Sequence, residues 1–233
     1  MNFYKLYQGN CLSVLEDIDF DVVITDPPYG LNFNYNTYND TKENLVKLIS
    51  DFMPIIKKKC DRIYIMCGIT QISLYPKPDW VLAVTWNTTG SFGKYGYTQW
   101  MPILAYGDDL PGFGNVNQVT KTDVFKISGG SGVGFMRSKK EKEHTCPKPL
   151  NIMKQVVNRL TEKNDVVCDP FIGSGTTMYA CQDLGRSCIG IDIDEKYCEL
   201  TKKRCFTRRF LDREVEYDFI RKRESKPDAS TVD

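Results

Sequence analysis

The sequence predicts an α/β protein built around a doubly wound, mostly parallel sheet. Segments with helical periodicity alternate with short apolar runs in both the first and the last third of the chain. One of these runs, FDVVIT, holds consecutive apolar residues without alternation, as expected of a strand in a parallel sheet covered on both faces. The middle differs, because ten of the 17 glycines lie between Gly90 and Gly134. We therefore expect one sheet interrupted by a small Gly- and aromatic-rich insert.

The first 87 residues are predicted to form four strands and two helices. The expected strands cover 5–8, 20–25, 62–68 and 80–86. A short helix is expected within 9–18 and a longer one within 41–59, where Leu45, Ile49 and Phe52 fall on one face. Pro54 lies inside the longer helix and should kink it.

Residues 88–143 are predicted to be the insert, with two short strands at 101–107 and 123–127 and a mobile run, SGGSGVGF. Regular alternation resumes in residues 144–210. Helices are expected at 149–160, 176–185 and 195–206, and strands at 165–170 and 187–194. The charged residues 211–233 should form a partly disordered tail.

Composition narrows the class of protein. The chain has 233 residues, 41% hydrophobic content and a net charge of +1, values typical of a soluble globular domain. It has no apolar stretch of membrane-spanning length and no signal-like start, so we expect no membrane association and a cytoplasmic location. Nine cysteines without a CxxC pair indicate reduced, buried thiols, and we expect no metal site.

A basic run near the end of the chain allows two interpretations. KKRCFTRR, residues 202–209, has five basic residues in eight. A solvated helix face is the favoured interpretation, and a patch that contacts nucleic-acid phosphates is the alternative.

A glycine turn follows the strand at 165–170. Gly173, Ser174, Gly175 and Thr176 stand between that strand and the next helix, where backbone N–H groups can bind an anion. Nineteen residues after Gly173, at the end of the next strand, comes Asp192, which can accept hydrogen bonds from ribose hydroxyls.

The turn departs from two common phosphate-binding patterns. Met178 replaces the third glycine of GxGxxG, and no lysine follows as in a Walker A loop. We therefore expect a ligand with a ribose and a small anionic group but no pyrophosphate, and S-adenosylmethionine fits that description. A tight turn without a ligand is the alternative.

The tetrapeptide Asp26-Pro27-Pro28-Tyr29 ends the buried strand 20–25. Ligands of open parallel sheets bind beyond the carboxyl ends of the strands. There the Asp26 carboxylate and the Pro27 carbonyl can accept both hydrogens of an exocyclic –NH₂ group, which frees the nitrogen lone pair for attack on a sulfonium methyl. Asp26 would also stabilise the positive charge that develops on nitrogen, and the ring of Tyr29 offers a stacking surface for a base.

Together, DPPYG, FIGSGTT and EHTCPKP resemble the amino-group DNA methyltransferases, in the branch whose catalytic motif precedes the methyl-donor motif. The resemblance spans about residues 4–206. It implies a Rossmann-like fold, S-adenosylmethionine as methyl donor and double-stranded DNA as substrate. It also implies that the target base is extruded from the duplex and that residues 88–143 read the target sequence. Related enzymes are sometimes dimeric, so a homodimer stays open.

The resemblance also implies site residues. Asp26, Pro27, Pro28 and Tyr29 would be catalytic. Contacts to the donor would come from Asn10, Cys11, Asp26, Lys148, Asp169, Phe171, Gly173, Ser174, Gly175, Thr176 and Asp192. Lys148 would lie near the methionine carboxylate. Asn10 stands where the family has an aspartate, so its contact with the donor adenine would use different hydrogen bonds.

The target atom is not settled by these residues, because adenine N6 and cytosine N4 are both exocyclic amines. An initial Asp in the tetrapeptide tends to accompany adenine in this family, which favours N6. Carbon methylation is disfavoured, because Cys146-Pro147 reverses the Pro-Cys order that it uses, and protein or RNA methylation more often accompanies NPPY. A non-catalytic relative that binds DNA and donor is the alternative from another class.

Overall fold

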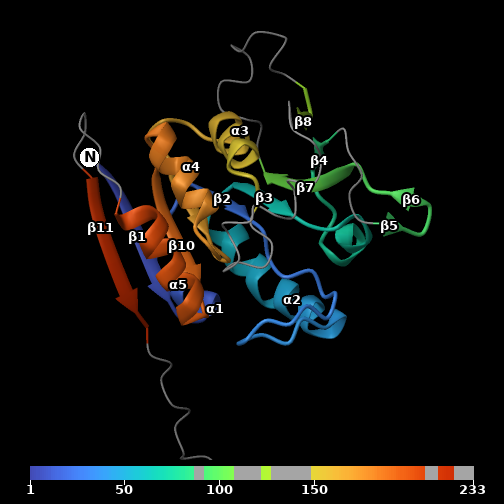
Figure 1. Ribbon diagram of the computed structural model, residues 1–233, viewed down its shortest axis with the longest axis horizontal. Helices are drawn as coiled ribbons and strands as arrows, with labels where there is room; N and C mark the ends of the chain where they lie inside the picture. Colours follow the sequence, from blue (N-terminus) through green and yellow to red (C-terminus); the bar gives the residue numbers. More distant parts are fainter. Residues whose placement is uncertain (87–91, 108–121, 127–147, 208–214, 223–233) are drawn as a thin grey trace, which may run out of the picture.

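The computed structural model describes residues 1–86, 92–107, 122–126, 148–207 and 215–222. Nine strands form one sheet in the order β11-β1-β10-β9-β2-β3-β7-β4-β8 (Figure 1). Their bounds are Asn2–Gln8 (β1), Val22–Thr25 (β2), Arg62–Met66 (β3), Trp80–Thr85 (β4), Trp100–Gly107 (β7), Val124–Lys126 (β8), Val166–Asp169 (β9), Ser187–Asp192 (β10) and Val215–Arg221 (β11). The predicted α/β sheet is confirmed.

The sheet is parallel except at β7, which runs antiparallel to both β3 and β4. β2 lies between β9 and β3 and is parallel to both. Parallel strands end at the same edge, so the residues after β2, β9 and β10 meet there. This carboxyl edge is where open α/β sheets bind ligands.

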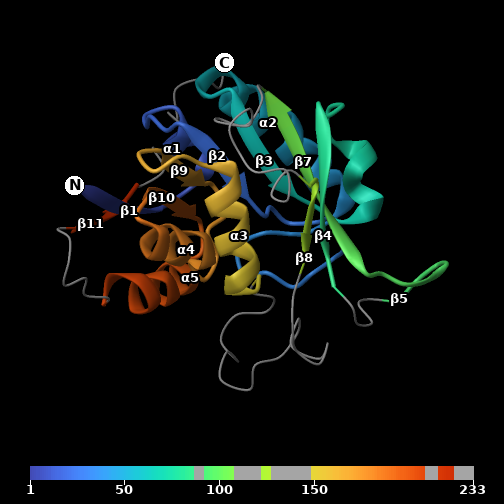
Figure 2. The same ribbon diagram turned by 90° about the horizontal axis from the view of Figure 1, so that it is seen from above.

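Helices cover both faces of the sheet (Figure 2). On one side lie α1 (Cys11–Leu15) and α2 (Lys42–Lys59). On the other lie α3 (Leu150–Leu160), α4 (Thr176–Leu184) and α5 (Glu195–Thr201). Successive residues of β2 serve both layers, because Val22 and Ile24 pack with the second group and Val23 with the first. Two-sided burial explains the uninterrupted apolar run of this strand.

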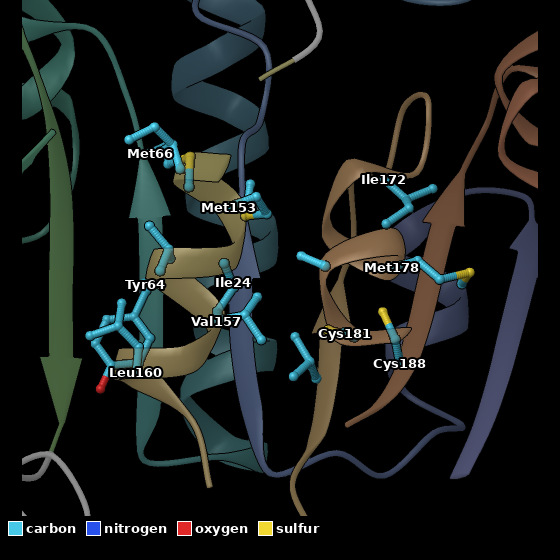
Figure 3. Packing of buried hydrophobic residues seen from close by; sticks show 14 of the residues in the cluster. Ile24, Tyr64, Met66, Met153, Val157, Leu160, Ile172, Met178, Cys181 and Cys188 are labelled. Atoms are coloured by element: carbon cyan, nitrogen blue, oxygen red, sulfur yellow. The ribbon is translucent and has the colours of Figure 1, made fainter. Parts of the chain in front are cut away.

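The second helical layer fixes the position of the site relative to the sheet. Met153 and Val157 of α3 pack with Ile24 of β2, and Met178 of α4 lies farther along the same cluster, toward Cys188 of β10 (Figure 3). These five side chains are at most 2% exposed, and complete burial of a large apolar side chain contributes about 1.5–3 kcal/mol. The start of α4, which follows the glycine turn, is thereby held against the sheet.

Several elements depart from the sequence-based expectation. β11 was not anticipated; it pairs in parallel with β1 within residues 211–233, which had been assigned to a tail. The insert contains a further hairpin of β5 (Phe92–Gly93) and β6 (Gly96–Tyr97), and a 3-10 helix, η1, covers Ile69–Leu74. Pro54 lies inside α2, within the single helix that the sequence predicts there.

The mobile run predicted at 128–135 and most of the insert lie outside the described residues. Within those residues, all eight cysteines are buried and free, and no group of three or more potential metal ligands occurs. None of the helices in this part of the chain is long and apolar enough to cross a membrane.

Candidate active site

Asp26 directly follows β2 and projects from the carboxyl edge of the sheet. Its side chain is 24% exposed. The hydroxyl of Tyr29 donates to Oδ1 at 2.6 Å, and the ammonium of Lys148 donates to Oδ2. Both carboxylate oxygens are therefore oriented by the chain itself, while part of the group stays accessible to a substrate.

Tyr29 supports Asp26 from a largely desolvated position. Its hydroxyl also lies 3.6 Å from the sulfur of Met101 on β7, and the Lys148 ammonium lies 5.2 Å from the ring centroid. Burial, followed by the charge of Asp26, raises the pKa of Tyr29 well above its usual value. Tyr29 thus remains a neutral hydrogen-bond donor at physiological pH.

Lys148 was expected near the methionine carboxylate of the donor. The structure places it between Asp26 and the ring of Tyr29, with only 10% of its side chain exposed. Its ammonium therefore occupies one acceptor that a target –NH₂ would use. His144, Thr145, Cys146 and Pro147, the preceding residues of that motif, lie outside the described residues.

The loop after the tetrapeptide is closed by a buried carboxylate that the sequence analysis missed. Asp40, 1% exposed, accepts hydrogen bonds from the backbone N–H groups of Gly30, Leu31 and Phe33. Asn36, farther along the loop, donates to Asp194 beside β10 at 3.3 Å. The loop thus reaches from the catalytic tetrapeptide to the half of the sheet that carries the glycine turn.

The glycine turn joins β9 to α4 in a conformation that favours glycine. Gly173 has φ 52° and Gly175 has φ 79°, a region that other residues rarely adopt. A Cβ on Gly175 would lie 2.9 Å from side-chain atoms of Thr201. The turn leads into the N-terminus of α4, where backbone N–H groups and the helix dipole favour an anion such as a carboxylate.

Asp192 ends β10 beside this turn, as the spacing predicted. Its Oδ2 accepts from the N–H of Gly173 at 3.0 Å, and its Oδ1 accepts from the N–H of Asp194 at 2.8 Å. Burial raises the pKa of Asp192 to about 7, although these two hydrogen bonds oppose the shift. Each oxygen keeps a second lone pair, so the carboxylate suits a ribose diol.

Asn10 and Cys11 lie next to Asp192, because β1 pairs with β10 and Gly9 donates its N–H to the carbonyl of Asp192. The side chain of Asn10 caps α1 by accepting from the N–H of Leu12 at 3.0 Å. Cys11 is buried, and that burial raises the pKa of its thiol to about 12. The thiol therefore stays protonated, and Cys11 is no nucleophile at neutral pH.

A second set of residues supports the turn from the side of α5. Thr201 donates to the carbonyl of Gly173 at 2.7 Å. Arg204 donates to Thr176 Oγ1 at 3.1 Å and to the carbonyl and hydroxyl of Ser174, each at 3.4 Å. The hydroxyl oxygens of Ser174 and Thr176 therefore accept from the chain, while each hydroxyl still has an O–H that can donate to a ligand.

These contacts change the interpretation of the basic run KKRCFTRR. Its first five residues form a π-helix, η4 (Lys202–Phe206), that extends α5. Arg204 turns toward the glycine turn, Cys205 is buried, and Lys202 pairs with Glu199. This half of the run is therefore not a uniformly solvated face. Arg208 and Arg209 lie outside the described residues.

Asp169 and Phe171 flank Pro170 at the start of the turn. Asp169 is 3% exposed, and Thr25, Phe171 and Thr177 donate to its two oxygens. Burial raises the pKa of Asp169 to about 6, against the effect of these bonds. The ring of Phe171 packs edge-on against Phe52 at 5.7 Å. The Asp169 carboxylate is thus occupied within the chain.

The structure brings the two predicted motifs together. β2 and β9 are adjacent strands, so the tetrapeptide and the glycine turn leave neighbouring positions on one edge. The Thr25 hydroxyl spans the two strands to Asp169 at 2.7 Å. The chemistry of this edge fits S-adenosylmethionine, because Asp192 suits its ribose and the N-terminus of α4 suits its carboxylate.

Comparisons with known proteins identify relatives of the chain. A family model described as DNA methylase, N6_N4_Mtase, matches residues 94–203. The type II methyltransferase M.HpaI of Haemophilus parainfluenzae is 30% identical over 226 residues, which cover 83% of this chain and 70% of that relative.

Two solved structures share the fold. The M1.HpyAVI–SAM complex aligns with a TM-score of 0.64 at 22% identity over 86% of this chain and 98% of that chain. The cytosine-N4-specific PvuII DNA methyltransferase aligns with a TM-score of 0.64 at 17% identity over 86% and 87%. The likeness to M.HpaI, together with the family model, shows that the chain belongs to the amino-group DNA methyltransferases, which use S-adenosylmethionine to methylate DNA.

Proposed function

We propose that this enzyme methylates the N6 amino group of adenine in double-stranded DNA. The observation that carries the proposal is the position of Asp26, a partly exposed carboxylate at the end of β2, one strand away from the glycine turn on β9. An adenine amine bound there would lie beside the donor site. The initial Asp of the tetrapeptide supports adenine over cytosine through the tendency of the family.

The donor supplies an electrophilic methyl group on its sulfonium. Asp192 would hold the ribose, and the N–H groups at the start of α4 would face the methionine carboxylate. The guanidinium of Arg204, bonded to Ser174 and Thr176, adds positive charge behind that position. Asn10 and Cys11 would line the adenine side through the cap of α1.

Asp26 and the Pro27 carbonyl would accept the two hydrogens of the target amine. This grip turns the nitrogen lone pair away from conjugation with the ring and toward the methyl carbon. As the C–N bond forms, the C–S electron pair stays on sulfur and positive charge develops on nitrogen beside the Asp26 carboxylate. The surplus proton then leaves nitrogen through Asp26 to solvent.

Lys148 must move before this complex can form, because its ammonium occupies Oδ2 of Asp26. Its long side chain would then be free to approach the methionine carboxylate, the contact that the family resemblance implies. Replacing Lys148 with methionine tests this, since a lysine that contacts the donor should weaken donor binding when it is lost. Unchanged donor affinity would assign Lys148 to Asp26 alone.

Access to the amine requires that the base leave the helical stack. The loop that Asp40 closes carries Phe33, Tyr35 and Tyr38. The ring centroid of Tyr35 lies 5.0 Å from that of Phe33 and 6.4 Å from that of Tyr38. Such a cluster is suited to stack on an extruded base or fill its gap. Residues 88–143 would read the surrounding sequence.

Cytosine N4 is the second candidate, because the PvuII enzyme that shares the fold is cytosine-N4-specific. Nucleoside mass spectrometry of unmethylated plasmid DNA treated with the enzyme and S-adenosylmethionine separates the two. We expect N6-methyldeoxyadenosine. N4-methyldeoxycytidine would replace the adenine assignment, and donor binding without any DNA product would favour the non-catalytic alternative.

A further inference from the structure

The side chain of Asp169, at the end of β9, forms hydrogen bonds to residues of β2 and α4 near the site. The hydroxyl of Thr25 donates to its Oδ1 at 2.7 Å, and the hydroxyl of Thr177 donates to its Oδ2 at 2.6 Å. The N–H of Phe171 also donates to Oδ1, at 3.1 Å. Hydrogen bonds to an ionised acceptor are short and strong, so this buried carboxylate holds β2, β9 and α4 in a fixed arrangement.

The two threonines belong to the two motifs of the site. Thr25 is the last residue of β2 and immediately precedes Asp26. Thr177 lies in the first turn of α4, two residues after Gly175. Both hydroxyls are at most 3% exposed by residue, so water does not compete for them. A displacement at either end would pass to the other through Asp169.

A buried carboxylate is a costly way to hold two strands and a helix together. Burial disfavours the charged form of a carboxylate, and burial is indeed the largest influence on the pKa of Asp169. An apolar contact between β2 and β9 would hold the strands together without that cost. What the carboxylate adds is a fixed geometry, because it accepts from defined directions on both sides.

We propose that Asp169 is a positioning residue, which sets the distance between the amine acceptor Asp26 and the donor-binding turn through Thr25 and Thr177. This inference rests on the proposed function and adds to it. Methyl transfer needs the attacking nitrogen and the methyl carbon in line at close range, and a misplacement of about 1 Å can cost about 100-fold in rate. In this proposal Asp169 acts through Thr25 and Thr177 and not by contact with a reactant.

The test is a pair of substitutions at Thr25. Thr25→Val keeps the shape but removes the donor, and Thr25→Ser restores it. Donor affinity is measured by calorimetry with S-adenosylmethionine, and methyl transfer by single turnover on unmethylated plasmid DNA with tritiated donor. We expect Thr25→Val to slow transfer at least about 10-fold while the donor Kd stays within about 3-fold, and Thr25→Ser to recover most of the rate.

Thr161→Val provides the matched control. Thr161 is also a buried threonine at the end of α3, where its hydroxyl donates to the carbonyl of Val157 at 2.6 Å and accepts from Nε of Arg186 at 3.2 Å. Loss of these two bonds should lower the melting temperature without changing the transfer rate. Asp169→Asn serves as a second variant should Thr25→Val fold poorly, and the same split between rate and donor affinity is expected.

Three results would overturn the proposal. Transfer by Thr25→Val at the wild-type rate would show that the hydrogen bond from Thr25 to Asp169 does not position Asp26. An equal loss of rate and donor affinity would assign the network to donor binding alone. A serine variant as slow as the valine variant would separate the effect from the hydroxyl. A wild-type enzyme that methylates no DNA amine would instead refute the proposed function.

Discussion

Replacing Tyr29 with phenylalanine removes one oxygen atom and, with it, the hydrogen bond that orients Asp26. The bond is 2.6 Å long and ends on a carboxylate. A hydrogen bond to a charged group contributes about 1.5–3 kcal/mol, and each 1.4 kcal/mol corresponds to tenfold in rate. If Asp26 must be held in place only when the amine attacks, methyl transfer should slow by about 10- to 100-fold.

Single-turnover transfer of tritiated methyl groups to unmethylated DNA measures this step directly. Donor affinity, measured by calorimetry, should stay within about 2-fold, because the partners of the Tyr29 hydroxyl among the described residues are Asp26 and Met101, not the glycine turn, and phenylalanine keeps the ring beside Lys148. Tyr106→Phe is the matched control: its hydroxyl donates to the carbonyl of Pro76 at 2.8 Å, and its loss should leave transfer unchanged. Wild-type transfer in Tyr29→Phe, or an equal slowing in Tyr106→Phe, would refute the orienting role.

Three further changes test the donor site by calorimetry with S-adenosylmethionine. Gly175→Ala should weaken binding more than about 10-fold, because its Cβ would meet Thr201 at 2.9 Å and φ is 79°. Gly96→Ala, which also has a positive φ but no atom within 4 Å of the added Cβ, should not. Arg204→Met should weaken binding about 3- to 10-fold through its lost bonds to the turn, and the exposed Lys203→Met should not. Affinity should fall as pH drops below about 7, where Asp192 gains a proton, and equal affinity at pH 6 and 8 would exclude Asp192 as the ribose acceptor.

The raised pKa of Asp192 also makes the free energy of unfolding depend on pH. Between about pH 4 and 7 the folded chain holds a proton on Asp192 that the unfolded chain has released. The contribution of this group to the free energy of unfolding is therefore present at low pH and is lost as pH rises through about 7. Asp192→Asn should lack that component, which urea unfolding at several pH values can measure.

The central strands and both motifs could be predicted from the sequence because their signals are local. FDVVIT carries three consecutive apolar residues, since β2 is buried on both faces, and the glycines of FIGSGTT mark a turn that only glycine enters easily. The spacing to Asp192 followed from the βα unit itself. The apolar run, the glycine turn and the spacing to Asp192 each depend on residues close together in the sequence, so sequence patterns can predict them.

The remaining parts depend on contacts that a single sequence does not reveal. The bond from Thr25 to Asp169 joins residues 144 positions apart, although a threonine at the end of an apolar strand indicates that its hydroxyl has a partner. Arg204 was counted within a basic run, and no charge count shows that it turns toward Ser174. β11 was missed because VEYDFIR alternates with charges at a half-buried sheet edge and resembles a polar tail.

The proposed mechanism of methyl transfer depends most on Asp26 as the acceptor of the target amine. Methyl transfer and donor binding, measured on the same preparation of Asp26→Ala, test this most directly. We predict that tritium incorporation into DNA falls below detection while the Kd for S-adenosylmethionine stays within about 3-fold of wild type. Substantial methylation of DNA by Asp26→Ala would contradict the account.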